Sequence, residues 1–252
     1  MNEPNLETGK PSVSFIVFAL NEEARIEATV ETLLKAIAQS NLADYQIVLV
    51  NDGSTDKTGE LMDRMAGQNS KICAIHNQTN LGQGGAYKHG LTMAACDYVM
   101  AIAGDNAASI ESITTTIGPV GKADIIVPYA ANPEDRVFVR RAGSSLFTSV
   151  INVLFGLKMP YYNGAVPRRM FFNKITIKSN GYAFFAEMVV RLVKEGCSHT
   201  VVGVRYPTST NDHTSALRIK NLVAVLKDVG RLFFDVRRPK TVTSEAVLNR
   251  ES

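Results

Sequence analysis

The sequence lacks several features that would assign it to a specialised class of protein. It has only three cysteines with no metal-ligand spacing, which argues against a disulfide framework and favours a reducing compartment. No apolar run is long enough to span a membrane, and residues 1–11 contain no apolar signal region. The net charge of +3 is too small to indicate nucleic-acid binding. We therefore expect a cytoplasmic protein without a nucleic-acid partner.

The 252 residues are 45% apolar and 20% charged, which is typical of a globular protein. Apolar β-rich runs alternate with segments of helical periodicity, and this order favours an α/β fold with a mostly parallel sheet flanked by helices. The expected strands are residues 12–20, 46–50, 72–76, 98–103, 124–129 and 200–206. The expected helices are residues 26–37, 57–67, 91–95, 136–157, 184–194 and 215–238, with a glycine-rich loop at 80–90 and another loop at 159–169.

The stretch 46–58, QIVLVNDGSTDKT, is the centre of the predicted site. Its apolar first half predicts a buried strand, and the polar turn that follows lies where α/β sheets hold ligands, at the carboxyl ends of their strands. There Asp52 would accept hydrogen bonds from a base or a ribose. The alternative is that the turn only caps the next helix, with Ser54 or Asp56 as the capping residue.

Further motifs follow the other predicted strands. Residues 18–22 read FALNE, residues 80–90 read NLGQGGAYKHG, and Gly104-Asp105 follows the fourth strand. Together with residues 50–56, these motifs resemble the family-2 glycosyltransferases of GT-A (Rossmann-like) fold. The glycine-rich segment is most similar to that of the polyprenyl-phosphate (dolichyl-phosphate) mannose and glucose synthases. Asn163-Gly164 and Gly181-Tyr182 fit the same branch more loosely.

The resemblance implies transfer of a sugar, with inversion, from a GDP- or UDP-linked donor to an acceptor, for which we expect a polyprenyl phosphate. It assigns catalytic roles to Asp105 and Glu187, although Glu187 is also placed for a salt bridge to Arg191 one helical turn away. It assigns the nucleotide-sugar to Leu20, Asn21, Glu22, Asp52, Gly53, Ser54, Gly82, Gly84, Lys88 and Gly104. The acceptor and its phosphate are assigned to Arg140, Arg141, Asn163, Arg205 and Arg218.

The family's Asp-x-Asp motif, which binds a divalent metal, is incomplete in this chain. Ala103 stands in place of the first acid, so that Asp105 and Asn106 are the remaining candidates for holding Mg²⁺ or Mn²⁺. The phosphate-binding segment late in the family's sequence is also poorly matched, with only Ser215 in common. These departures leave two alternatives open: a nucleotide-sugar-binding homologue that regulates or scaffolds a partner without catalysis, and a transferase with a soluble acceptor.

We expect a disordered leader at 1–11, a single domain at 12–238 and a tail at 239–252. The domain would divide into a nucleotide-sugar-binding half (12–130), an acceptor half (131–215) and an amphipathic C-terminal helix (216–238). On that helix, Leu222, Val225, Leu226, Val229, Leu232, Phe233 and Val236 would form the packed face. The basic residues Lys220, Lys227, Arg231 and Arg238 would lie opposite, either solvated or against anionic lipid headgroups at the inner membrane surface. A homo-oligomer and a membrane partner protein both remain open.

Overall fold

The computed structural model describes residues 9–135, 138–162, 164–206 and 219–237. The predicted leader, apart from residues 9–11, and the predicted tail lie outside these residues, and the division into halves stays a prediction. None of the described helices is both long and apolar enough to cross a membrane.

The centre of the fold is a four-stranded parallel sheet in the order β3-β2-β1-β4. Its central strands are apolar on both faces, which is why they can lie between two layers of helices. The strands are β1 (Ser12–Ala19), β2 (Asp44–Asn51), β3 (Ile72–His76) and β4 (Tyr98–Ala103). The predictions for 72–76 and 98–103 are confirmed to the residue.

A second sheet continues beyond β4 and has the order β6-β5-β7. Strand β5 (Ile125–Ala130) pairs parallel with β7 (His199–Val204) and antiparallel with the two-residue strand β6 (Val166–Pro167). A single bridge between Tyr98 and Arg168 connects the two sheets. Strand β6 lies in the segment 159–169, which the sequence had predicted to be a loop.

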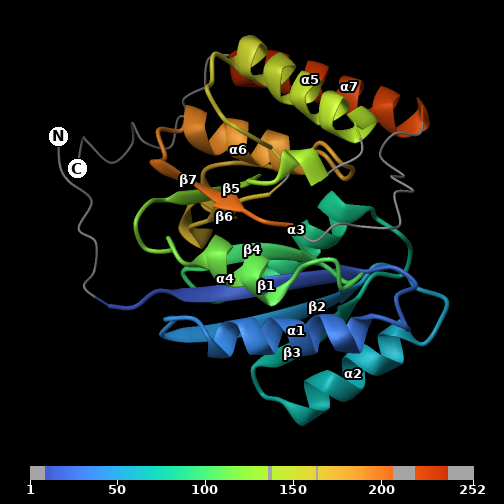
Figure 1. Ribbon diagram of the computed structural model, residues 1–252. Helices are drawn as coiled ribbons and strands as arrows, with labels where there is room; N and C mark the ends of the chain where they lie inside the picture. The colour runs from blue at the N-terminus through green and yellow to red at the C-terminus, as the bar shows by residue number, and fades with distance from the viewer. Residues whose placement is uncertain (1–8, 136–137, 163, 207–218, 238–252) are drawn as a thin grey trace, which may run out of the picture.

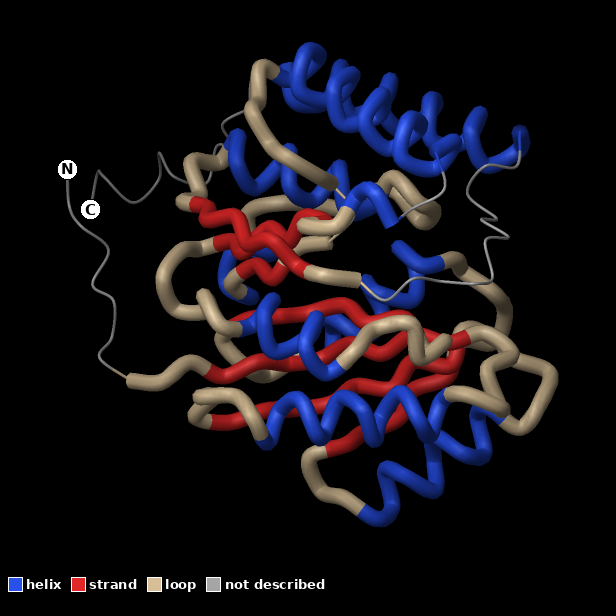
Figure 2. The backbone as a smooth tube through the Cα atoms, viewed as in Figure 1, coloured by secondary structure: helices blue, strands red, loops and turns tan. Residues whose placement is uncertain are grey.

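The helices form two layers (Figures 1 and 2). One core cluster packs α1 (Ile26–Ala38), α2 (Thr58–Gln68) and α4 (Ile110–Ile117) on one face of the sheets. The other core cluster packs α3 (Gln83–Met93) and α6 (Phe184–Lys194) on the opposite face, with α5 (Phe138–Phe155) and α7 (Ile219–Arg237) outermost. The short 3-10 helices are η1 (Pro133–Asp135) and η2 (Arg169–Asn173).

The glycine-rich segment is the main correction to the predicted elements. A loop was expected through residue 90, but α3 already begins at Gln83, after Gly82 with its φ of +79°. Glycine costs about 1 kcal/mol relative to alanine inside a helix, so propensity argued against this start. Close packing explains it: a Cβ on Gly90 would collide with the side chain of Ile16 and lie 3.0 Å from Val50 Cγ2. The glycines therefore allow α3 to lie directly against β1 and β2.

This packing predicts opposite outcomes for two glycine substitutions in helices. We expect Gly90→Ala to lower the free energy of unfolding by about 2 kcal/mol, because the added methyl group overpacks the sheet. Gly67→Ala in α2 should instead raise it by about 0.5–1 kcal/mol, because no atom lies within 4 Å of its added Cβ. Urea unfolding of both variants provides the measurement. A stabilised Gly90→Ala variant would contradict the close approach of α3.

Candidate functional site

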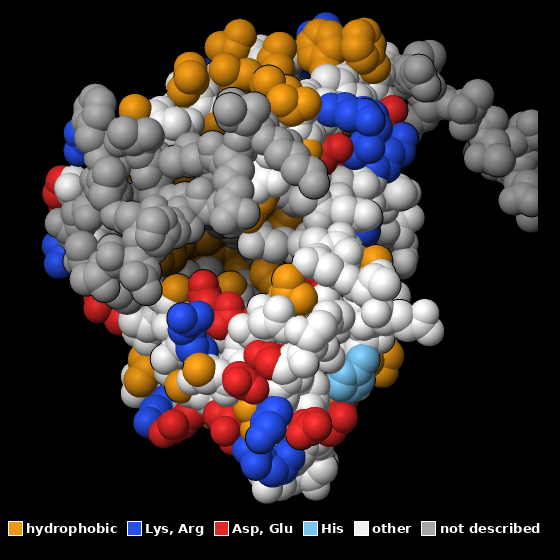
Figure 3. Space-filling view, turned by 90° about the vertical axis from the view of Figure 1, so that its right-hand side faces the viewer, with side chains coloured by type: hydrophobic (Ala, Val, Ile, Leu, Met, Phe, Trp, Pro, Cys, Tyr) orange, Lys and Arg blue, Asp and Glu red, His pale blue; other side chains and the backbone are white. Residues whose placement is uncertain are grey.

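The loops that follow β1, β2, β3 and β4 lie at the carboxyl edge of the parallel sheet, on the right-hand side in Figure 2. Figure 3 views the molecule from that side. A hollow opens in the middle of this face, with hydrophobic side chains on its walls and Asp and Glu side chains below it. We call the four loops together the carboxyl-edge rim, which comprises residues 20–23, 52–57, 77–82 and 104–107.

The first two loops of the rim are joined by hydrogen bonds. The backbone N–H of Asn21 donates to Ser54 Oγ at 2.9 Å, and Asn21 Oδ1 accepts from the backbone N–H of Thr55 at 2.8 Å. Asn21 has a φ of +55°, a conformation that asparagine tolerates better than most residues. The backbone N–H of Glu22 donates to the hydroxyl of the fully buried Thr58. The turn after β2 therefore supports the turn after β1.

Asp56 strengthens the same junction. Its carboxylate accepts from the N–H and hydroxyl of Thr58, at 3.0 and 2.6 Å, and from the N–H of Glu23 at 3.2 Å. Burial raises the pKa of Asp56, but these hydrogen bonds outweigh it and leave the pKa below its ordinary value of 3.8. Asp56 thus binds Thr58, the first residue of α2, but it is not the capping residue that the alternative foresaw, because Lys57 occupies the N-cap position and no side chain caps it.

Asp52 is a buried carboxylate that organises the third loop. Only 5% of the residue is exposed, and Oδ1 accepts from Asn77 Nδ2 at 2.7 Å and from the N–H of Leu81 at 2.9 Å. Oδ2 accepts from the N–H of Gly82 at 3.0 Å. Next to it, Gly53 has a φ of +76°, and a Cβ there would lie 2.7 Å from the carbonyl carbon of Thr79. The contact of Asp52 with a nucleoside stays a prediction, whereas its support of residues 77–82 is structural.

The fourth loop carries the metal candidates. A Cβ on Gly104 would lie 2.6 Å from Ala19 Cβ, so glycine is needed for β4 to end against β1. Asp105 is exposed, and its Oδ1 accepts from the N–H of Ala107 at 3.1 Å. Asn106 has a φ of +55° and its Oδ1 accepts from Thr32 Oγ1 at 3.1 Å. Asp105 therefore faces solvent, while the amide of Asn106 is engaged with α1.

The beginning of α3 approaches residues 179–180 very closely. A Cβ on Gly82 would lie 2.6 Å from the carbonyl oxygen of Asn180, and one on Gly84 would lie 2.6 Å from that of Ser179. The N–H of Gly84 donates to the Asn180 carbonyl at 2.8 Å. Lys88 Nζ donates to Asn180 Oδ1 at 2.6 Å, and burial lowers the pKa of Lys88, with nearby Glu187 opposing the shift. Two close backbone approaches and two hydrogen bonds thus join the glycine-rich segment to the residues before α6.

Glu187 holds these residues from the other side. Only 3% of it is exposed, and its carboxylate accepts from the N–H groups of Lys178 and Ser179, at 3.1 and 2.7 Å. It also accepts from Arg191 Nε at 2.8 Å, as the alternative interpretation of the sequence had anticipated. Arg191 continues to Asp235 on α7 at 3.0 Å. This set of partners gives Glu187 a positioning role, and its catalytic role stays a prediction.

The residues predicted to bind the acceptor are only partly described. Arg141 on α5 and Arg205 after β7 are exposed. Asn163 and Arg218 lie outside the described residues, as does the side chain of Arg140.

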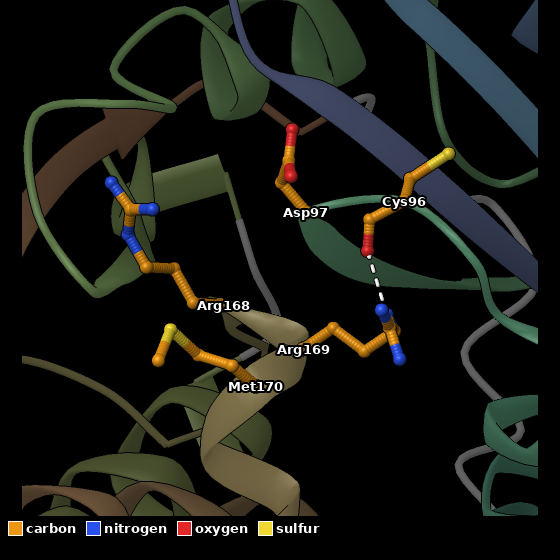
Figure 4. A pocket seen from close by; sticks show the side chains of 5 residues that line it. All are labelled: Cys96, Asp97, Arg168, Arg169 and Met170. Atoms are coloured by element: carbon orange, nitrogen blue, oxygen red, sulfur yellow. Dashed lines mark hydrogen bonds between the residues drawn. The ribbon is translucent and has the colours of Figure 1, made fainter. Parts of the chain in front are cut away.

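A small pocket lies at the opposite edge of the sheet (Figure 4). It is lined by Cys96, Asp97, Arg168, Arg169 and Met170, next to the beginning of β4. Arg169 Nε donates to the Cys96 carbonyl at 3.0 Å, Arg168 pairs with Asp124 at 3.5 Å, and the Arg168 guanidinium lies over the Tyr98 ring. Its polar groups form contacts where the two sheets meet. The pocket lies at the edge of the sheet opposite the carboxyl-edge rim.

Sequence reasoning missed several residues that shape the rim. Asn77 links Asp52 to His89, whose Nδ1 lies 2.5 Å from Asn77 Oδ1. Because the Asn77 amide nitrogen donates to Asp52, the Asn77 amide oxygen faces His89. Asn180 was also missed. The glycine spacing 82–84–85 was the available signal, since closely spaced glycines in a helix indicate a close backbone neighbour.

The fold and the rim define an α/β protein that presents its polar loops at the carboxyl edge of a parallel sheet. The sequence of residues 14–193 matches the family described as glycosyl transferase family 2. The chain therefore belongs to glycosyl transferase family 2, and the resemblance seen in its motifs is confirmed.

Curated relatives match part of the chain. A dolichyl-phosphate beta-glucosyltransferase of Trichomonas vaginalis is 36% identical over 102 residues, which are 39% of this chain and 31% of the relative. An undecaprenyl-phosphate 4-deoxy-4-formamido-L-arabinose transferase of Photorhabdus laumondii is 28% identical over 152 residues, 60% of this chain and 46% of the relative. The chain thus matches less than half the length of either relative.

Solved structures share the fold over nearly the whole chain. Glucosyl-3-phosphoglycerate synthase of Mycobacterium tuberculosis, solved with Mn²⁺, UDP and phosphoglyceric acid, has a TM-score of 0.67 at 14% identity, covering 94% of this chain and 82% of that one. A mannosyltransferase of Pyrobaculum calidifontis, solved with GDP-Man and Mn²⁺, has a TM-score of 0.63 at 15% identity, covering 92% and 67%. The predicted GT-A architecture is thereby confirmed.

The burial of Asp52 predicts a large effect on stability. Asp52→Asn keeps the shape of the side chain but places an amide group opposite N–H donors, so we expect a loss of about 2–3 kcal/mol in the free energy of unfolding. Asp105→Asn is the control: it is exposed and should change stability by less than about 0.5 kcal/mol. Urea denaturation measures both, and amide exchange at 81–82 should accelerate only in Asp52→Asn. Equal stabilities would show that Asp52 does not hold this loop.

The partners of Glu187 give a second prediction. Glu187→Gln replaces a buried charge that is paired with Arg191, and we expect a loss of about 3 kcal/mol in stability because Arg191 loses half of its compensation. Amide exchange should accelerate at Lys178 and Ser179. Glu31→Gln, which breaks an exposed pair with Lys35, is the matched control and should cost less than about 0.5 kcal/mol. Wild-type stability with strongly reduced turnover would instead favour a purely catalytic Glu187.

Proposed function

We propose that the protein transfers a sugar from a nucleotide-sugar to an acceptor, with inversion at the anomeric carbon. The observation that carries the proposal is the convergence of Asn21, Asp52-Gly53, Gly82 and Gly104-Asp105 at one sheet edge, beside the hollow of Figure 3. The family membership and the UDP and GDP-Man found in the structural neighbours support it.

The donor would bind along the rim. Leu20 and Leu81 are 38% and 43% exposed, and such apolar side chains next to a polar rim suit the flat face of a nucleobase. Backbone groups near Asn21 and Gly53 would contact the nucleoside, and Lys88 and the start of α3 would face the diphosphate, since helix N-termini and cations favour anions. Residues 104–105 would lie beside the diphosphate.

In the reaction, an acceptor oxygen forms a bond to the anomeric carbon while the bond from that carbon to the diphosphate oxygen breaks. The nucleoside diphosphate leaves with both electrons of that bond. A phosphate acceptor is already ionised at neutral pH, so the step needs no strong general base. This agrees with the structure, in which the buried acids Asp52, in the rim, and Glu187, on α6, are engaged in structural hydrogen bonds.

A divalent metal would stabilise the negative charge that grows on the leaving diphosphate. In the described part of the chain, no group of three or more metal-binding side chains exists. Asp105 supplies one exposed carboxylate, which fits Mg²⁺ or Mn²⁺ provided that diphosphate oxygens and water complete the shell. Because Asn106 Oδ1 is engaged with Thr32, Asp105 is the stronger of the two candidate ligands.

For the acceptor we propose a polyprenyl phosphate, because the two curated relatives are named for dolichyl phosphate and undecaprenyl phosphate. The exposed Arg141 and Arg205 are candidate contacts for its phosphate. The protein would then work at the cytoplasmic face of a membrane.

The missing acid at position 103 favours a second candidate, a protein that binds nucleotide-sugar but does not transfer it. Calorimetry combined with a transfer assay separates the two. Tight donor binding without nucleoside diphosphate release, in the presence of membrane extract and Mn²⁺, would support the non-catalytic candidate.

Asp105 provides the test of the metal assignment. We expect Asp105→Asn to remove the gain in UDP or GDP affinity produced by Mn²⁺, a loss of about tenfold or more, because the only exposed carboxylate of the 104–107 loop is neutralised. Isothermal titration with the nucleoside diphosphate, with and without Mn²⁺, measures it. Affinity without metal should not fall, and Glu111→Gln, on the neighbouring helix α4, is the charge-matched control. An unchanged metal effect would show that Asp105 is not a ligand.

A further inference from the structure

The outermost helices, α5 and α7, lie side by side and expose a set of large hydrophobic side chains (Figure 1). On α5 these are Leu146, Val150 and Val153, which are 67%, 40% and 82% exposed. On α7 they are Val223, Leu226 and Phe234, at 59%, 61% and 65%. Figure 3 shows hydrophobic side chains gathered along the top of the molecule, where these helices lie. We call these six residues the outer apolar face.

The outward orientation of α7 is fixed by what holds its inner side. Val229 and Leu232 are buried, and Phe233 packs edge-on against Phe155 of α5 at 6.2 Å between ring centroids. Asp235 Oδ2 accepts from Lys178 Nζ at 2.6 Å and from Arg191 at 3.0 Å. Val223, Leu226 and Phe234 therefore form a second apolar side of α7, distinct from the side that packs on the core. This corrects the sequence prediction, which placed Leu226 on the packed face.

Charge is distributed unequally around α7. At about 100° per residue, Lys227 lies within about 40° of both Val223 and Phe234, whereas Arg237 lies about 40° from Val223 and about 60° from Phe234. The acids Asp228 and Asp235 point elsewhere, Asp228 to Ser179 and Arg231 and Asp235 to Lys178 and Arg191. Lys227 and Arg237 are exposed. Helix α5 contains no acidic residue at all.

We propose that the outer apolar face, together with Lys227 and Arg237, docks the protein on the surface of an anionic lipid bilayer. The proposal deepens the proposed function, since a lipid-linked acceptor requires such a contact. Apolar side chains among cations, with the acids turned inward, match acyl chains beneath anionic headgroups. A second copy of this chain fits less well, because a two-fold contact would bring Lys227 and Arg237 against like charges.

The position of this face suits the proposed reaction. In Figure 3 the hydrophobic top of the molecule and the hollow of the carboxyl-edge face are seen in the same view, so the hollow opens at the side of the docked surface.

Vesicle co-sedimentation of the full chain tests the docking. The probes are vesicles of phosphatidylglycerol mixed with phosphatidylcholine, and vesicles of phosphatidylcholine alone, at low and high salt. We expect binding to the anionic vesicles that weakens at high salt. Leu226→Ser and Phe234→Ser should each reduce the partition coefficient about tenfold, and Lys227→Gln about fivefold. Met170→Ser, also an exposed hydrophobic side chain but on η2, is the matched control and should bind like the wild type.

The outcomes separate the possibilities. Equal or absent binding in all variants overturns the proposal. Sedimentation velocity without vesicles is run in parallel, and a dimer that Phe234→Ser dissociates, without vesicle binding, would assign the face to a second copy instead. Since the vesicles contain no sugar donor, docking can fail while UDP or GDP binding persists, or succeed while it fails, so the two proposals are tested independently.

Discussion

The arrangement of the rim depends on the close approach between the beginning of α3 and the backbone at residues 179–180. At Gly82 and Gly84, a carbonyl oxygen occupies space that any side chain would need. This contact joins the glycine-rich segment, which contributes to the rim, to the residues that precede α6. Without it, Asp52 and Glu187 would each hold a loop, but the two loops would have no fixed relation to one another.

Two buried carboxylates secure this approach from opposite sides. Asp52 binds the N–H groups of Leu81 and Gly82, and Glu187 binds those of Lys178 and Ser179. Removing a carboxylate from water is costly, and backbone donors repay the cost only when they are held in place. The two acids therefore determine the position of the loops more than they add to overall stability. This structural role also explains why the carboxylate oxygens of Asp52 and Glu187, two residues predicted to contact substrate, are engaged in hydrogen bonds within the protein.

Much of the architecture could be predicted from the sequence because strand and helix periods depend on local pattern. Strands 72–76 and 98–103 and helix 184–194 were predicted with their correct bounds. The start of α3 could not be predicted, since local propensity argues against glycine and only the contact of Gly90 with Ile16 and Val50 explains it. The division into two sheets was likewise hidden, because the two-residue strand β6 has no detectable period.

The rim was predictable to the extent that parallel strands bring their carboxyl ends together, which places Asn21, Asp52 and Asp105 at one edge. The hydrogen-bond partners of the site residues were not predictable. Thr32 comes close to Asn106, and Asn180 to Lys88, only through tertiary packing. The prediction of which side of α7 faces the core was wrong for a related reason. Its sequence has apolar residues on two sides, and periodicity alone cannot tell which of them faces the core.

The polar contacts of α7 decide that question. Asp228 accepts from the hydroxyl of Ser179 at 2.5 Å, and Asp235 binds Lys178, so the helix is attached to the same two residues that Glu187 holds. One residue further along the chain, Asn180 contacts Gly84 and Lys88. These contacts, together with the covalent chain from Ser179 to Asn180, connect α7 to the glycine-rich segment, whose residues Leu81 and Gly82 bind Asp52. A helix that is fixed in this way presents its outer side as a rigid surface, whose position is set by the same contacts that set the rim.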